Sequence, residues 1–94
     1  MRYNVIMKEK ELERIFKALA NRRRLAIIFF IRKKKQANVG EIAEAIKLSF
    51  KSTSRHLSIL VSSGILDREQ NSLYSIYSFS TDQSETVRNI LSVI

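Results

Sequence analysis

One spacing of apolar residues, i, i+3, i+4 and i+7, occurs in three separate segments of this chain and constrains its fold more than any other feature. At 3.6 residues per turn, this spacing places four apolar side chains on one face of a helix. The quartets are Leu12, Ile15, Phe16 and Leu19; Val39, Ile42, Ala43 and Ile46; and Val87, Ile90, Leu91 and Ile94. The pattern predicts three amphipathic helices, of which the first covers residues 9–20 and the last residues 82–94.

Two more helices are expected in the middle of the chain. Residues 21–34 carry apolar side chains on every side, which predicts a central helix covered by its neighbours. Another amphipathic helix is predicted over about residues 50–63. Its core-facing quartet is Thr53, His56, Leu57 and Leu60. The expected N-caps of the second, third and fourth helices are Asn21, Asn38 and Ser49. Gly64 is expected to end the fourth helix in the left-handed conformation.

A β-hairpin is predicted after Gly64, with strands from Ile65 to Gln70 and from Leu73 to Phe79. Asn71 and Ser72 are expected to form its tight turn, because asparagine tolerates the positive φ that such turns require. The predicted order is helix, helix, helix, helix, strand, strand, helix. This is a mainly α fold with a small β-hairpin, in a single domain over residues 1–94.

The composition excludes several classes of function. The chain has no cysteine and one histidine, so disulfides, thiolate metal sites and multi-histidine metal sites within one chain are excluded. There is no glycine-rich phosphate loop, no nucleophile–base pair and no convergent pair of carboxylates, so we expect no enzyme and no cofactor. The longest apolar run, residues 25–31, is far shorter than the roughly 20 residues of a membrane span. Without a signal-peptide pattern either, the protein is expected to be cytoplasmic and soluble.

The chain carries 17 lysines and arginines against 9 acidic residues, a net charge of +8, which points to an acidic partner. Nucleic acid is a better candidate than a membrane surface. The charge is uneven, because residues 1–38 hold 12 basic and 3 acidic side chains. Residues 39–79 hold four of each and are neutral. Charge alone therefore does not locate the binding site.

Residues 39–63 have the spacing of a helix-turn-helix, in which the second helix lies in the major groove of DNA. The two predicted helices are joined by Lys47, Leu48 and Ser49. On a helical wheel of the second helix, the side opposite the apolar stripe carries Lys51, Arg55, Ser58 and Ser62. No acidic residue occurs from Lys51 to Ser63, which favours a DNA-contacting face over an ordinary solvated face. The neutral charge of residues 39–79 keeps a protein-interaction module as the alternative.

Four blocks of sequence, in the same order along the chain, also carry a family resemblance. They are Ala18-Leu19-Ala20-Asn21-Arg22-Arg23-Arg24-Leu25, Val39-Gly40-Glu41-Ile42-Ala43, Leu48-Ser49 with Ser54-Arg55-His56-Leu57 and Leu60, and Gly64-Ile65-Leu66. Over roughly residues 10–80 the chain resembles the ArsR-type winged-helix transcriptional regulators. The resemblance implies a homodimer built from the first and last helices. It also implies paired recognition helices and a hairpin wing, residues 65–79, on double-stranded operator DNA, in a regulator that acts as a repressor.

The resemblance and the wheel together give two sets of candidate residues. The DNA-binding set is Ser49, Phe50, Lys51, Ser52, Ser54, Arg55, Ser58 and Arg68. The dimer-interface set is Leu12, Ile15, Phe16, Val87, Ile90, Leu91 and Ile94. The metal sensors of the family carry cysteines, or histidine and aspartate on the last helix, whereas this last helix offers only Asp82 and Glu85. No metal site is expected, and a small-molecule effector is left open.

Several single residues keep two interpretations. Phe50 either covers the core or contacts a thymine methyl group. Arg22 and Arg23 either contact phosphate or are solvated, whereas Arg24 matches an arginine of the family and is expected to be structural. His56 is expected to be packed or to face a phosphate rather than to bind a metal.

Overall fold

The structure, a computed structural model, describes the backbone of residues 2–94 and the side chains from residue 8 onward. Its elements are α1 (Arg2–Leu19), α2 (Arg22–Lys34), β1 (Gln36–Asn38), α3 (Val39–Ile46), α4 (Phe50–Ser62), β2 (Leu66–Gln70), β3 (Ser75–Phe79) and α5 (Glu85–Ser92). The predicted helices and hairpin strands all occur in the predicted order, and the mainly α class is confirmed, but an additional strand, β1, lies between α2 and α3. Two boundaries differ, because α1 begins well before residue 9 and α5 covers only the middle of residues 82–94.

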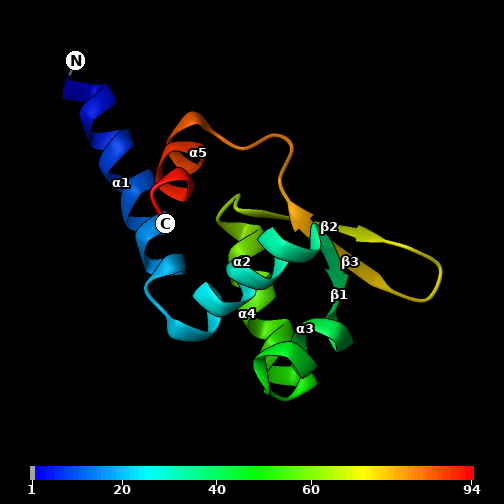
Figure 1. The fold of residues 1–94 in the computed structure, drawn as a ribbon. Helices are drawn as coiled ribbons and strands as arrows, with labels where there is room; N and C mark the ends of the chain where they lie inside the picture. Colours follow the sequence, from blue (N-terminus) through cyan, green and yellow to red (C-terminus); the bar gives the residue numbers. More distant parts are fainter. Residues whose placement is uncertain (1) are drawn as a thin grey trace.

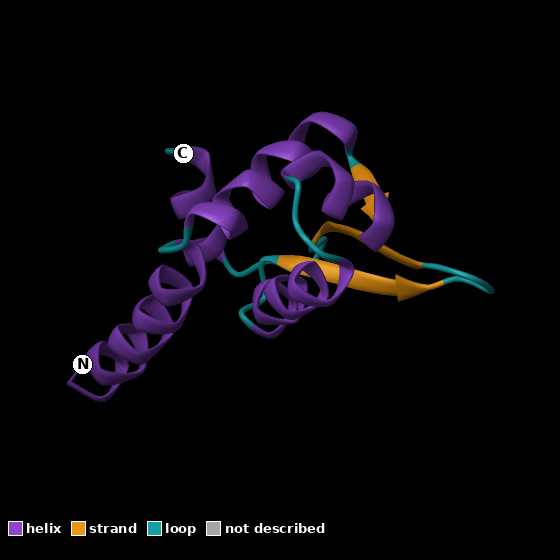
Figure 2. Ribbon diagram, turned by 90° about the horizontal axis from the view of Figure 1, so that it is seen from below, coloured by secondary structure: helices purple, strands orange, loops and turns teal. Residues whose placement is uncertain are grey.

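The helices α2, α3 and α4 form the body of the molecule (Figure 1). The N-terminal end of α1 and the β2–β3 hairpin project from opposite sides of this body (Figure 2). After the hairpin, the chain returns so that α5 lies beside α1 (Figure 1). There Val87 and Leu91 of α5 join Ile15 of α1 in the buried apolar cluster. The hairpin projects from the body as a wing (Figure 2).

The sheet contains a third strand that the sequence pattern does not indicate. β1 pairs antiparallel with β3, so the strand order is β1-β3-β2. Ala37 in β1 is buried opposite Tyr77 of β3. Three residues are too few to show an alternation of apolar and polar side chains, which is why this strand was not predicted. It anchors the base of the wing to the end of α2.

The predicted two-residue turn of the wing is wrong. The strands pair only as far as Gln70 and Ser75, so four residues form the loop. The loop is closed by a hydrogen bond in which the Asn71 amide donates to the Tyr74 carbonyl at 2.7 Å. Asn71 does not adopt a positive φ. The loop takes up Leu73, which is 82% exposed and therefore contributes nothing to strand packing.

The predicted helix caps are all present. The Asn21 side chain accepts hydrogen bonds from the amides of Arg23 and Arg24. Asn38 and Glu41 form a reciprocal capping box with distances of 2.8 and 2.9 Å. The Ser49 hydroxyl accepts from the Ser52 amide, and Gly64 has a φ of +81°. These local signals fix where α2, α3 and α4 begin and where α4 ends.

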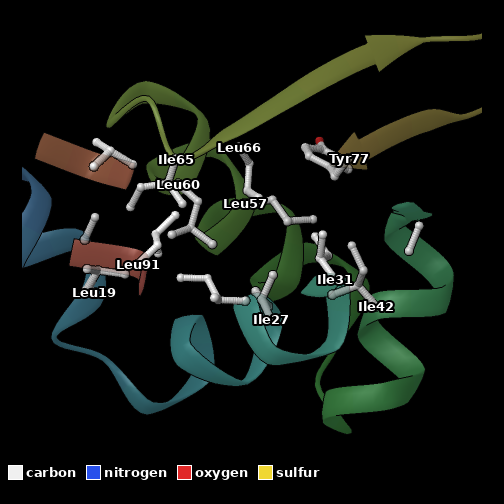
Figure 3. Packing of buried hydrophobic residues seen from close by; sticks show 14 of the residues in the cluster. Leu19, Ile27, Ile31, Ile42, Leu57, Leu60, Ile65, Leu66, Tyr77 and Leu91 are labelled. Atoms are coloured by element: carbon white, nitrogen blue, oxygen red, sulfur yellow. The ribbon is translucent and has the colours of Figure 1, made fainter. Parts of the chain in front are cut away.

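The core is centred on α2, as expected, but α2 is not covered on every side. Its residues Ile27, Ile28 and Ile31 are fully buried, and Figure 3 shows Ile31 beside Ile42 of α3. Phe29, however, is 49% exposed, and its ring lies 5.9 Å from the Arg32 guanidinium carbon. The expectation of a helix surrounded by neighbours is therefore wrong for this side. With 94 residues, the chain has too few elements to enclose a helix completely.

Thr53, in the core-facing quartet of α4, has a hydroxyl group without a hydrogen-bond partner among the described residues. It is fully buried on α4, and its Oγ1 atom makes no hydrogen bond. A buried hydroxyl without a partner costs about 1–3 kcal/mol. Valine has nearly the same shape and carries no such group. We expect Thr53→Val to raise the free energy of unfolding by about 1 kcal/mol in urea titrations followed by circular dichroism.

The matched variant is Thr53→Ser, which keeps the hydroxyl and removes the methyl group. It should lower the free energy of unfolding by about 1 kcal/mol, because buried apolar volume is removed. Destabilisation by Thr53→Val would show that the hydroxyl is satisfied and would contradict the prediction.

Candidate nucleic-acid interface

The turn between α3 and α4 holds the two helices in a fixed relation. Lys47 ends α3 in the left-handed conformation, with a φ of 57°. The Leu48 amide then donates back to the Ala43 carbonyl at 3.0 Å, and Ser49 caps α4. Thr53, Leu57 and Leu60 are buried, so they set the rotation of α4 about its axis. The opposite side of α4 is turned to the solvent as a consequence.

None of the predicted DNA-contacting residues is buried in the structure. The exposed residues of this set are Ser49, Phe50, Lys51, Arg55, Ser58 and Arg68, and the half-buried ones are Ser52 and Ser54. Among the side chains from residue 8 onward, the ion pair is Lys17–Glu13, on α1. Lys51 and Arg55 therefore have no carboxylate partner within that part of the chain. Both cations are available to an external anion.

Phe50 is 62% exposed, so the interpretation that it covers the core is wrong. It is the first residue of α4, where the chain has just left the turn and the core begins only at Thr53. It lines one groove between α4 and the wing and a second groove between the start of α3 and the loop of the wing. The other interpretation, contact with a thymine methyl group, stays a prediction.

A groove of about 480 Å³ lies between α4 and the wing. It is lined by Phe50, Ser54 and Ser58 of α4 and by Arg68 of β2, so four predicted residues meet there. The guanidinium of Arg68 is held across the hairpin, because it donates to Ser75 Oγ at 3.2 Å and to Gln70 Oε1 at 2.9 Å. Gln70 and Ser75 were not predicted, and only the strand register brings them to Arg68. Lys51 and Arg55 lie outside this groove, on the exposed side of α4.

The three consecutive arginines at the start of α2 have different environments. Arg22 is exposed. Arg23 donates from Nη1 to the Ile46 carbonyl at the end of α3, at 3.1 Å. Arg24 donates to the carbonyls of Lys17 and Ala18, and its Nη1 atom lies 3.0 Å from His56 Nδ1. Arg24 is structural, as expected, and of the three only Arg22 has a side chain without a hydrogen bond to the described part of the chain.

His56 is packed against Arg24 rather than placed in a site for a metal. A guanidinium has only donors, so Nδ1 of His56 accepts and the proton of the neutral ring lies on Nε2. Burial lowers the pKa of His56 below its usual value near 6.5, and the positive charges of Arg24, Arg23 and Arg55 lower it further. The folded protein therefore favours the neutral ring.

This lowered pKa predicts a pH dependence of stability. In the unfolded chain His56 takes up a proton near pH 6.5, whereas the folded chain takes it up only at lower pH. The contribution of His56 is therefore fully present above pH 6.5 and is lost as the pH falls through the folded-state pKa. Urea unfolding at pH 7.5, 6.5 and 5.5 measures it. We expect the wild type to lose more stability over this range than His56→Gln, and parallel losses would contradict the assignment.

The sequence also matches the model of a protein family, and this match agrees with the arrangement of α3, α4 and the wing. A family model described as bacterial regulatory protein, arsR family, matches residues 21–68. The chain belongs to the ArsR family. The matched segment runs from the cap of α2 into β2, so it contains the whole helix-turn-helix. No curated protein sequence matches this ArsR-family chain significantly.

Solved structures of similar fold cover nearly the whole ArsR-family chain. HlyU from Vibrio cholerae is 26% identical, with a TM-score of 0.77 over 92% of this chain and 89% of that one. The transcriptional repressor PagR of Bacillus anthracis is also 26% identical, with a TM-score of 0.76 over 94% and 97%. A homodimeric winged helix-turn-helix DNA-binding domain from Mycobacterium bovis is 25% identical, with a TM-score of 0.79 over 98% and 80%.

The predicted dimer residues of this ArsR-family protein fall into two groups. Ile15, Val87 and Leu91 are buried within the single chain. Leu12 and Ile90 are half-buried, whereas Phe16 is 52% exposed and Ile94 is 42% exposed. Val93, which was not in the predicted set, is 79% exposed. We define the α1–C-terminal surface as Leu12, Phe16, Ile90, Val93 and Ile94, the residues here that retain apolar area for a partner.

Two expectations about other kinds of site can be compared with the described part of the protein. Among side chains from residue 8 onward, no three His, Cys, Asp or Glu residues lie close enough to hold a metal ion. Over residues 2–94, no helix is both long and apolar enough to cross a membrane. The hydrogen bond between Arg24 and His56 joins residues 32 positions apart in the sequence. The family resemblance indicated that Arg24 is structural, but it did not indicate this partner.

Proposed function

We propose that this ArsR-family chain is a cytoplasmic transcriptional repressor that binds operator DNA as a homodimer, without a cysteine metal-sensing site. The observation that carries the proposal is the exposed side of α4. Lys51, Arg55 and Ser58 lie there, and neither cation has a carboxylate partner among the side chains from residue 8 onward; the rotation of the helix is set by buried residues. A helix held in this way, next to a wing, fits the major groove of DNA.

Some residues of this face would contribute mainly to the affinity for DNA, and others to the preference for a particular sequence. Lys51 and the serine hydroxyls suit phosphate contacts, which position the protein and make binding depend on salt. Arg55 can donate two parallel hydrogen bonds to the O6 and N7 atoms of a guanine. Arg68, whose guanidinium is oriented by Gln70 and Ser75, would contact DNA beside the major groove that holds α4. The net charge of +8 adds long-range attraction to the duplex.

Homodimerisation is proposed through the α1–C-terminal surface. A chain of this size buries a modest fraction of its surface, so covering exposed apolar side chains would add stability. The similar domain from Mycobacterium bovis is described as homodimeric, and PagR of Bacillus anthracis is described as a transcriptional repressor. Both support the proposal for this chain. A two-fold axis would place the two copies of α4 in successive major grooves, about 34 Å apart.

A titration of mixed-sequence duplex DNA across salt concentrations tests the binding of DNA as such. We expect the affinity to fall steeply with salt. Lys51→Ala should reduce the slope of log K against log[salt] by about 0.9 for each phosphate that the lysine neutralises in the wild type. The matched control is Lys10→Ala, an exposed lysine in the part of α1 that projects away from α4 (Figure 2). For Lys10→Ala, the slope of log K against log[salt] should equal that of the wild type.

The same titration distinguishes DNA binding from the competing function, a protein-interaction module. Exposed apolar side chains at the wing tip and at the start of α4, namely Leu73, Tyr74 and Phe50, would suit a protein partner. If the affinity for DNA is undetectable or independent of salt, the winged helix is a protein-interaction module and the proposal is wrong.

A further inference from the structure

A second concave region lies away from α4, between the C-terminal end of α2, the end of β3 and α5. This α2–β3–α5 pocket has a volume of about 630 Å³, within the range of small-molecule sites. Its apolar side chains are Ile31, Phe79 and Leu91. Ile31 and Leu91 are buried and Phe79 is half-buried, so the apolar part of the pocket is continuous with the core. Such a lining suits the hydrocarbon part of a ligand.

Three cationic side chains, Arg32, Lys35 and Arg88, line the same pocket. No acidic residue lines it, and none of the three has a carboxylate partner among the side chains from residue 8 onward. Arg32 uses one donor, Nη2, to bond the Leu91 carbonyl at 3.0 Å, which leaves further N–H groups of its guanidinium. The pocket therefore combines an apolar wall with unneutralised positive charge.

The helix dipole does not account for this set of charges. Arg32 lies in the last turn of α2 and Lys35 follows it, where cations are favoured in any helix. Arg88, by contrast, comes from the middle of α5 and brings a third like charge to the pocket. Lys35 also has a φ of 80°, a conformation that favours glycine or asparagine. The dipole therefore accounts for Arg32 and Lys35 but not for Arg88, whereas an anion in the pocket would be attracted by all three.

We propose that the α2–β3–α5 pocket binds a small monocarboxylate with an apolar body, such as a medium-chain fatty acid or an aryl-alkanoate. The carboxylate would lie against Arg88, Lys35 and the free donors of Arg32, and the apolar body against Phe79 and Leu91. A planar guanidinium matches a carboxylate with two parallel hydrogen bonds, which makes this anion a better fit than a halide.

The pocket stays accessible in the proposed dimer. On a helical wheel of α5 with Val87 at zero, Arg88 lies at about 100° and Ser92 at about 140°. Ile90, of the α1–C-terminal surface, lies at about 300°, on the other flank of the helix. One flank of α5 is thus free for a partner subunit, while the other lines the pocket.

The walls of the pocket suggest what a bound ligand would do, and this step rests on the proposed function. The pocket joins α5, next to the dimer surface, to β3, which is a strand of the wing. Arg32, which would hold the carboxylate with its free donors, also bonds the Leu91 carbonyl and so links α2 to α5. A ligand that favours one arrangement of wing and α5 would change the affinity for operator DNA.

The test uses the full chain labelled with ¹⁵N and titrated with decanoate and, separately, with 4-phenylbutyrate. We expect the amide resonances of Phe79, Arg88 and Leu91 to shift with at least one of the two acids. Decanol, which has the chain of decanoate without its charge, should bind at least about tenfold more weakly, because it cannot form the charged hydrogen bonds. Arg88→Gln should weaken binding of the acid about tenfold.

Arg55→Gln is the matched control, with the same loss of charge on α4. It should leave binding of the acid unchanged while it weakens binding of DNA, so a failure of the pocket and a failure of the proposed function are distinguishable. The inference is overturned if neither acid shifts these resonances at millimolar concentration, or if the shifts lie on the α1–C-terminal surface instead. It is equally overturned if decanol binds as well as decanoate, or if Arg88→Gln binds the acid like the wild type.

Discussion

Replacing Arg55 by alanine is expected to cost about 1–3 kcal/mol of the free energy of binding to operator DNA in each half-site, a loss of affinity of about 5- to 150-fold per half-site. Arg55 is exposed on α4, opposite the buried Leu57, and it has no acidic partner among the described side chains. A bidentate interaction with guanine would therefore be removed without compensation. Because each subunit loses a single base interaction, the sequence preference should relax at one base pair in each half-site. Titrations of the operator and of its single-base variants measure both effects.

Two further variants separate the contribution of the charge from that of the planar fork. Arg55→Lys keeps the positive charge and loses the two parallel donors, so it should retain affinity for mixed-sequence DNA and lose the preference at that base pair. Arg14→Ala removes an exposed arginine from α1 and should leave the preference unchanged. Unchanged affinity and unchanged preference in Arg55→Ala would mean that another face of α4 contacts the bases.

Replacing Arg24 by alanine is expected to lower the free energy of unfolding by about 2–4 kcal/mol, because several hydrogen bonds from one charged group are removed together. Its guanidinium connects the end of α1, through the carbonyls of Lys17 and Ala18, to His56 on α4. Leaving these two carbonyls without their donor adds to the cost. Urea unfolding monitored by circular dichroism measures this change in the free energy of unfolding.

The neighbouring arginines provide a matched series for this measurement. Arg23 makes one such bond, to the Ile46 carbonyl, so Arg23→Ala should cost about 1–2 kcal/mol. Arg22 is exposed, and Arg22→Ala should change stability by less than about 0.5 kcal/mol. The expected order of destabilisation is Arg24, then Arg23, then Arg22. Equal effects of the three substitutions would contradict the structural role assigned to Arg24.

Features that depend on a few adjacent residues could be predicted from the sequence. The caps at Asn21, Asn38 and Ser49 and the left-handed Gly64 are of this kind, since each needs only one side chain or one backbone angle. The exposed side of α4 follows in the same way from the spacing of its buried residues. The helical period alone was enough to place Lys51 outward.

Features that depend on distant parts of the chain could not be predicted in this way. β1 exists only because β3 offers it a partner, and the exposure of Phe29 depends on which helices reach α2. For the dimer set, the spacing identified an apolar face on α1 and on α5. The spacing could not indicate which of these side chains would be buried within the single chain, and Ile15 and Val87 are buried in its core. The lining of the α2–β3–α5 pocket likewise comes from three separate segments.

Selection of bound duplexes from a random DNA pool tests the central claim, that this chain binds specific DNA as a homodimer through α4. We expect the wild-type protein to enrich an inverted repeat. Its half-site centres should be separated by one helical turn, about 10–10.5 base pairs, or by a multiple of it. Enrichment of a single half-site would contradict the dimer, and a pool that remains random after selection would contradict sequence-specific binding altogether.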